Sequence, residues 1–203
     1  GAGISLGGTI LLNACMSDQS LTLSEPLLDG LVCISSPLDL LECSLSIERP
    51  RNIIYQRWLL NRLVKQTLSD PFGVQDEERE ALVSNKDSKV KIKDIRSFDN
   101  SITAPRWGYK DVNEYYLKAS PIFALSENKK IIPPTLFIQS IDDPWVPASS
   151  AETLKKKMLL CSDQKANKVI ISKNGGHNGF HGVDGCWGDY VVNKWLLGLS
   201  LRY

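Results

Sequence analysis

The chain has 203 residues, of which 42% are hydrophobic and 23% are charged, as is usual for one globular domain. Its 24 Lys and Arg residues almost balance its 23 Asp and Glu residues, so the formal net charge is only +1. The whole-chain charge therefore gives no argument for nucleic acid or an anionic membrane as a partner. No apolar run approaches the ~18–20 residues of a membrane-spanning helix. The five scattered cysteines favour a reduced intracellular protein over a disulfide framework.

The first part of the chain predicts a helix, a strand and a longer helix. Residues 8–16 follow a glycine cluster and predict a buried helix, and residues 30–35 predict a short buried strand. Residues 51–68 predict an amphipathic helix, whose apolar face would consist of Ile54, Trp58, Leu59 and Leu63. The highly charged run 76–96 is expected to be a solvated helix face or loop.

Strands and helices continue to alternate in the second half. Short apolar runs predict strands at 135–139 and 168–171, and helical patterns follow them at 149–160 and 190–199. Strands that alternate with helices favour a parallel sheet covered on both faces. We therefore predict an α/β fold, with a mainly parallel sheet flanked by helices and a helical insertion at approximately 40–130.

The chain begins with Gly-Ala-Gly-Ile-Ser-Leu-Gly-Gly, which contains a G-x-S-x-G pattern centred on Ser5. In a nucleophile elbow, the serine occupies a strained turn between a strand and a helix, and its hydroxyl is exposed. Gly3 and Gly7 would be needed because the turn packs backbone against backbone. The N–H of Leu6 would be one oxyanion donor. A dinucleotide-binding fingerprint is excluded, because its third glycine would fall on Leu6.

A serine hydroxyl is a weak nucleophile without an adjacent base, and the chain has two histidines. His177 lies in a Gly-Gly-His-Asn-Gly-Phe loop after the last predicted strand, which makes it the candidate base. His181 is expected to be structural. Although the two are four residues apart, the surrounding glycines oppose a helix and Asn178 replaces the glutamate of a zinc-binding H-E-x-x-H motif. We therefore expect no metal site.

The third member of a triad is a carboxylate that orients the histidine, and it should follow the strand before it. Asp142 and Asp143 follow the predicted strand 135–139. We favour Asp143, because Pro144 would fix the loop immediately after it, and keep Asp142 as the alternative acid. Asp39 is a weaker rival. The order serine, aspartate, histidine is that of the α/β-hydrolases.

Several motifs add a closer resemblance. The chain resembles the YheT-like, embryogenesis-associated branch of the α/β-hydrolases over nearly its whole length. The similar stretches are G-x-S-L-G-G at 3–8, S-P-L-D-L at 36–40, F-D-N at 98–100, T-A-P at 103–105, G-Y at 108–109, Y-Y at 115–116, A-S-P at 119–121, D-D-P at 142–144 and G-G-H-x-G-F at 175–180.

This resemblance implies a serine hydrolase with esterase, lipase or phospholipase activity on acyl or lipid esters, without a cofactor. Ser5 would be the nucleophile, His177 the base and Asp143 the acid. The insertion would cap the pocket, with Tyr55 and Trp58 as candidates to line it. Two alternatives remain open: a catalytically incompetent module that binds a lipid or a partner, and an acyltransferase that uses the same three residues.

The chain departs from the family at its start. In this fold several strands precede the elbow, but only four residues precede Ser5. We therefore expect these 203 residues to be the C-terminal part of a larger hydrolase and to be inactive alone. Some members of the branch have an N-terminal membrane anchor, so a segment before Gly1 could supply one. The sequence predicts neither the oligomeric state nor the acyl chain of the substrate.

Overall fold

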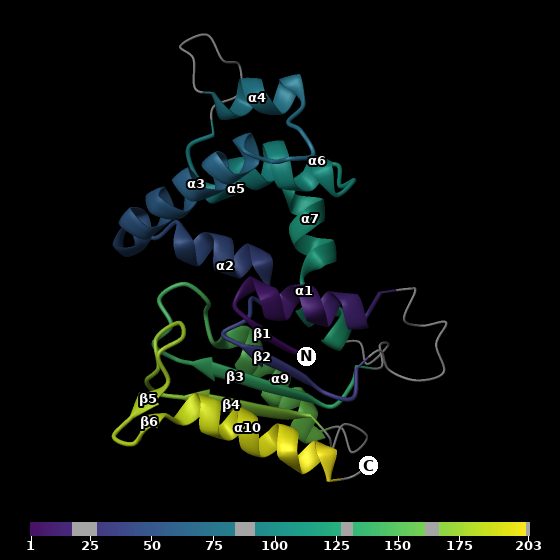
Figure 1. Ribbon diagram of the computed structural model, residues 1–203, viewed down its shortest axis with the longest axis vertical. Coiled ribbons are helices and arrows are strands. Elements are labelled where there is room, and N and C mark those ends of the chain that lie inside the picture. Colours follow the sequence, from purple (N-terminus) through teal and green to yellow (C-terminus); the bar gives the residue numbers. More distant parts are fainter. Residues whose placement is uncertain (18–27, 84–91, 127–131, 161–166, 202–203) are drawn as a thin grey trace. The chain divides into compact units, whose positions relative to one another are not determined.

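The computed structural model describes residues 1–17, 28–83, 92–126, 132–160 and 167–201, which form two compact units (Figure 1). The first unit comprises Gly1–Cys43 and Ala119–Tyr203, and the second comprises Ser44–Lys118. The second unit lies within the 40–130 range expected for the insertion. That it serves as a cap stays a prediction.

A four-stranded parallel sheet forms the centre of the first unit, in the order β1-β2-β3-β4. Gly3, Cys33, Phe137 and Val169 are aligned across it in one row. The α/β prediction is therefore confirmed, and three of the strands lie where the apolar runs predicted them. The first strand, which leads into the Ser5 turn, was not predicted. The strands are β1 (Ala2–Ile4), β2 (Leu31–Ile34), β3 (Thr135–Ser140) and β4 (Lys168–Ser172).

Helices cover both faces of the sheet. Helices α1 (Leu6–Cys15), α8 (Pro121–Ser126) and α9 (Ser149–Leu160) supply the side chains that pack with Cys33 and Phe137. Helix α10 (Trp187–Ser200) packs with Leu136 and Ile138 on the opposite face (Figure 1). Because neighbouring residues of a strand point to opposite faces, β3 contributes to both cores, and all six of its residues are buried. A short hairpin, β5 (His181–Gly182) and β6 (Gly185–Cys186), precedes α10.

In the second unit, all the regular structure among the described residues is helical. Its core contains the side chains of Leu60, Leu82, Ile95, Phe98 and Ile102. Helix α2 (Leu40–Ile47) begins in the first unit and continues into this one. The other elements are a 3-10 turn (Pro50–Asn52), α3 (Ile53–Leu68), α4 (Asp76–Leu82), α5 (Ile95–Phe98), a π-helical turn (Asp99–Thr103), α6 (Ala104–Arg106) and α7 (Val112–Ala119). None of the described helices is long and apolar enough to span a bilayer.

Helix α3 is present where the sequence predicted it, but its apolar face was wrongly predicted in part. Leu59 and Leu63 pack against the core of the second unit, as expected. Ile54 is 81% exposed and Trp58 is 54% exposed, so these two side chains are on the outer face.

The polar residue Gln56, which is not part of the predicted apolar face, is buried. Its Oε1 accepts the N–H of Ile95 and its Nε2 donates to the carbonyl of Ile47, both at 3.4 Å. A buried amide is tolerated when it is hydrogen-bonded, and these partners come from other segments of the chain. Hydrophobic periodicity within the helix cannot reveal them.

Candidate active site

Ser5 lies in the turn between β1 and α1, and its backbone has an unusual conformation. Its φ is 53° and its ψ is −133°. The Ser5 N–H donates to the carbonyl of Ile34 at 2.8 Å, and the Ser5 carbonyl accepts the N–H of Gly8 at 3.1 Å. A positive φ in a residue other than glycine costs energy and is concentrated at functional sites. This geometry is what a strand-to-helix nucleophile turn requires.

Two glycines allow β1 and α1 to approach closely, but one of them is not the residue that we expected. A Cβ on Gly3 would lie 2.5 Å from the Cα of Gly8, so a side chain there would collide with backbone. A Cβ on Gly8 would collide with the hydroxyl of Ser36 and lie 3.0 Å from the Gly3 carbonyl oxygen. A Cβ on Gly7 would meet nothing within 4 Å. The expectation is therefore wrong for Gly7, because α1 turns Gly8 toward the strand instead.

A chain of hydrogen bonds joins Ser5, His177 and Asp143. His177 Nε2 lies 2.9 Å from Ser5 Oγ, and His177 Nδ1 lies 2.9 Å from Asp143 Oδ2. The Asp143 side chain is fully buried, and its Oδ1 accepts the backbone N–H groups of Trp145 at 2.9 Å and Val146 at 3.0 Å. Both carboxylate oxygens are thus held in place. A donor–acceptor chain of this kind allows a histidine to take a proton from a serine hydroxyl.

Sequence reasoning missed Gln139, which lies at the end of β3 and contacts the same carboxylate. Its Nε2 donates to Asp143 Oδ2 at 3.2 Å and to the carbonyl of Val146 at 3.0 Å. The side chain is buried, so these bonds are shielded from water. An amide near the end of a strand has no distinctive sequence signal. Its role depends on the turn that brings residue 143 back beside residue 139.

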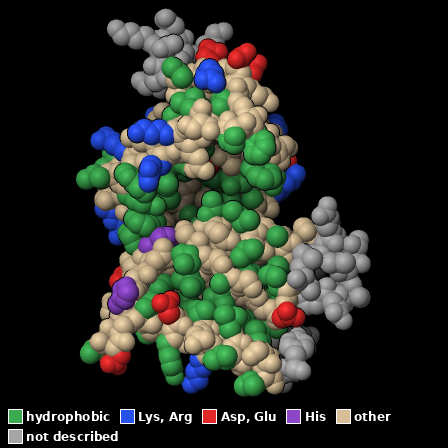
Figure 2. All heavy atoms as spheres, in the orientation of Figure 1, with side chains coloured by type: hydrophobic (Ala, Val, Ile, Leu, Met, Phe, Trp, Pro, Cys, Tyr) green, Lys and Arg blue, Asp and Glu red, His purple; other side chains and the backbone are tan. Residues whose placement is uncertain are grey.

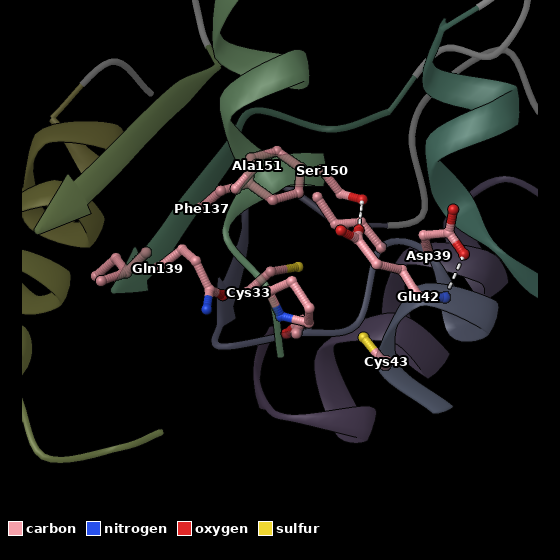
Figure 3. A pocket seen from close by; sticks show the side chains of 12 residues that line it. Cys33, Asp39, Glu42, Cys43, Phe137, Gln139, Ser150 and Ala151 are labelled. Carbon is pink, nitrogen blue, oxygen red and sulfur yellow. Dashed lines mark hydrogen bonds between the residues drawn. The ribbon is translucent and has the colours of Figure 1, made fainter. Parts of the chain in front are cut away.

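Gln139 also lines a small pocket, which Figure 3 shows together with Cys33, Glu42, Cys43 and Ser150. Its volume of about 10 Å³ is at the lower limit for one water molecule and far too small for an ester substrate. Burial raises the pKa of the Cys33 thiol to about 12 and also raises the pKa of Cys43. Both side chains are therefore neutral thiols near neutral pH.

The alternative acid, Asp142, contacts the histidine loop at another point. Its Oδ1 accepts the N–H of Gly176 at 2.8 Å, and this bond lowers the pKa of Asp142. Ser140 Oγ donates to the carbonyl of the same glycine at 2.5 Å. The structure thus places Asp143 against His177. Asp142 and Ser140 instead bind the backbone N–H and carbonyl of Gly176, the residue before the histidine.

The other two candidates from the sequence lie apart from this hydrogen-bonded chain. Asp39 Oδ1 accepts the N–H of Glu42 at 3.0 Å, so it serves the first turn of α2. His181 is exposed in β5. Across the described ranges, no group of three or more His, Cys, Asp and Glu side chains is placed to hold a metal ion.

Further features of the site lie at the carboxyl end of the parallel strands, where ligands bind in α/β folds. The N–H of Leu6 belongs to the first turn of α1, whose amides have no carbonyl partner within the helix. Within the described ranges, the residues other than glycine with positive φ are Ser5, Ser35 at 47° and Phe180 at 31°. Ser35 directly follows β2, and its buried hydroxyl has no hydrogen-bond partner among the described residues. Backbone strain is thus concentrated around the serine and the histidine loop.

No protein-family model matches the chain, but curated proteins match almost all of it. An abhydrolase domain-containing protein of Dictyostelium discoideum is 31% identical over 96% of this chain and 46% of its own length. The human phospholipase ABHD3 is 29% identical over 92% of this chain and 41% of its own length. The Escherichia coli putative esterase YheT is 31% identical over 89% of this chain and 48% of its own length. The chain therefore spans about half the length of these curated relatives.

One solved structure has a similar fold. An esterase of Pyrococcus furiosus superposes with a TM-score of 0.50, covering 98% of this chain and 52% of that protein at 10% identity. With such low identity, the likeness concerns the fold alone. The parallel sheet and this likeness agree with a partial α/β-hydrolase fold. The curated relatives show that the chain matches the YheT-like branch of the α/β-hydrolases.

Proposed function

We propose that the protein containing this chain is a serine hydrolase that cleaves carboxylic esters of lipids, with Ser5, His177 and Asp143 as its triad. The observation that supports this best is the hydrogen-bonded chain from Ser5 Oγ through the two ring nitrogens of His177 to Asp143, with both distances at 2.9 Å. The strained backbone of Ser5 supports it further. Relatives named phospholipase, putative esterase and monoacylglycerol lipase favour an acyl ester as the substrate.

The proposed reaction has two steps. In the first, Ser5 Oγ attacks the ester carbonyl while His177 Nε2 takes the hydroxyl proton, and the Leu6 N–H stabilises the negative oxygen. The imidazolium, held by Asp143, gives the proton to the leaving alcohol, and an acyl-serine remains. In the second step His177 takes a proton from water, which attacks the acyl-serine. The fatty acid leaves, and Ser5 regains its proton.

Gln139 has a supporting role in this scheme. Because it donates to the Asp143 oxygen that faces His177, it fixes the direction of that oxygen when the imidazole becomes charged. Trp145 limits the motion of the imidazole on another side, since the two rings lie edge to face with centroids 4.7 Å apart.

The test is covalent labelling of the full-length natural polypeptide with a fluorophosphonate, which reacts with activated serines. We expect one label on Ser5, complete loss of labelling in Ser5→Ala, and normal labelling in Ser69→Ala, which changes an exposed serine of the second unit. Fatty-acid release from phosphatidylcholine, measured with and without a competing alcohol, then separates hydrolysis from acyl transfer. An unlabelled wild-type protein, or undiminished labelling of Ser5→Ala, would show that the proposal is wrong.

A further inference from the structure

The outer face of α3 exposes large apolar side chains that do not belong to the core of the second unit. Ile54 is 81% exposed and Trp58 is 54% exposed, and they are four residues apart, so they lie on the same face of the helix. The Tyr55 ring stacks on Trp58, with ring centroids 6.0 Å apart. The outer face therefore has an apolar, aromatic centre.

Positive side chains surround this centre. Residues 51–68 include Arg51, Arg57, Arg62 and Lys65 but no Asp or Glu, and all four cations are exposed. At about 100° per residue, Arg57 falls on one side of the line from Ile54 to Trp58 and Arg62 on the other. No ion pair joins any of the four to a carboxylate within the described part of the chain.

One of these cations is also packed on the aromatic centre. The guanidinium carbon of Arg62 lies 5.5 Å from the centroid of the Trp58 ring, at cation–π distance. Figure 2 shows Lys and Arg side chains beside hydrophobic ones over the part of the second unit where Figure 1 places α3. The net charge of +1 for the whole chain thus conceals a local patch with four positive charges.

We propose that this face of α3, together with Arg51 in the 3-10 turn before it, docks on the surface of a bilayer that contains anionic phospholipids. Trp58 and Ile54 insert among the head groups, and Arg51, Arg57, Arg62 and Lys65 pair with lipid phosphates. Tryptophan favours the membrane–water interface because its ring is amphipathic, and each Lys or Arg near an anionic surface adds to binding. An exposed isoleucine contributes nothing to nucleic-acid phosphates but is favourable in the apolar part of a lipid surface.

The docking proposal goes beyond ester hydrolysis, and its test does not depend on hydrolytic activity. We would use the full-length natural polypeptide with Ser5→Ala, so that lipids are not consumed, and measure sedimentation with phosphatidylcholine vesicles with and without phosphatidylserine. Phosphatidylserine should strengthen binding. Arg57→Gln with Arg62→Gln should weaken binding to the anionic vesicles by about tenfold or more. The matched control, Lys155→Gln with Lys156→Gln, removes the same charge from exposed positions of α9 and should change binding by less than about twofold.

Insertion of Trp58 is measured separately, by quenching of tryptophan fluorescence with brominated phosphatidylcholine. Trp58→Phe should remove most of the quenching, whereas Trp107→Phe, at a tryptophan that is 75% exposed outside α3, should not. Equal weakening by the two double variants would overturn the proposal, because it would indicate a non-specific charge effect. Quenching that persists in Trp58→Phe would also overturn the proposal. So would a variant with Arg57→Gln and Arg62→Gln that binds the anionic vesicles as tightly as the wild type but no longer binds an oligonucleotide or an acidic protein.

Discussion

Asp142 Oδ1 accepts the backbone N–H of Gly176 at 2.8 Å. Asp142 directly precedes the proposed acid Asp143, and Gly176 directly precedes the proposed base His177. Ser140 Oγ bonds the carbonyl of the same glycine. The φ of Gly176 is +55°, a conformation that side chains disfavour. Its carbonyl is bound by Ser140, the last residue of β3, and its amide by Asp142, just after that strand. Two side chains therefore hold the backbone of the histidine loop, in addition to the contact between the imidazole and Asp143.

The two aspartates should respond differently to the same substitution. Asp143→Asn should lower kcat/KM by about 10⁴-fold, because an amide cannot stabilise the charged imidazole and favours the wrong tautomer. Asp142→Asn should lower kcat/KM by less than about tenfold, since its carbonyl oxygen can still accept the Gly176 N–H. Steady-state kinetics on a lipid ester would measure both. Equal losses in the two variants would contradict the assigned roles.

The two glycines near Ser5 provide a matched pair for stability. Gly3→Ala would place a Cβ against the backbone of Gly8, and we expect it to lower the free energy of unfolding by about 1–3 kcal/mol. Gly7→Ala meets open space on a helix and should raise that free energy by about 0.5–1 kcal/mol. Denaturant unfolding, with labelling of Ser5 as a second measurement, would test both. A stable, fully labelled Gly3→Ala variant would disprove the close approach of β1 and α1.

In the second unit, Arg106 joins two carboxylates. Its Nε donates to Glu78 Oε1 and its Nη1 to Asp70 Oδ2, both at 2.6 Å, and these bonds lower the pKa of each carboxyl. A pKa that is lower in the folded state gives stability at neutral pH that is lost as the pH falls through the lowered value. Arg106→Gln should therefore reduce the free energy of unfolding at pH 7, with about 1 kcal/mol from the Glu78 pair.

This difference between Arg106→Gln and the wild type should disappear in acid, once both carboxyls are protonated in the folded wild type. Thermal unfolding followed across the pH range would show the two melting curves converging. An offset that stayed constant at every pH would mean that Arg106 acts through packing instead. Lys118→Gln, which breaks an exposed ion pair with Glu114, is the control with little expected effect.

For Asp99 we expect the opposite pH dependence of the free energy of unfolding. Burial raises its pKa, although Tyr116 Oη and Thr103 Oγ1 donate to it at 2.8 and 2.7 Å. Because the folded state then holds the proton more tightly than the unfolded state, stability falls as the pH rises from the ordinary pKa to the raised one. Asp99→Asn should therefore stabilise the second unit at pH 7.

The gain from Asp99→Asn should vanish below the ordinary pKa of 3.8, where the aspartate is neutral in both states. Tyr116→Phe, which removes a donor to the carboxylate, should destabilise the unit at pH 7. Chemical denaturation at two pH values would compare the three proteins. A variant Asp99→Asn that is less stable than the wild type at pH 7 would refute the assignment.

The sequence predicted those parts of the fold that depend on local patterns. The run Leu31–Ile34 is apolar and includes two β-branched residues, which favours the buried strand that it forms. Gln56 and Gln139 could not be placed, because their partners come from distant segments or from a turn whose geometry is not encoded in a pattern. The open space at Gly7 likewise depends on how α1 rotates relative to β1.

Ser5 and His177 are 172 residues apart in the chain, and this separation has a kinetic consequence. Contacts between distant residues form late, because the entropy of closing a long loop must be overcome first, and parallel strands add to the delay. During refolding, helical circular dichroism should thus recover before reactivity of Ser5 toward a fluorophosphonate. Labelling of Ser5 during refolding would then measure when the last long-range contacts of the sheet form, so the same probe would follow both catalysis and folding.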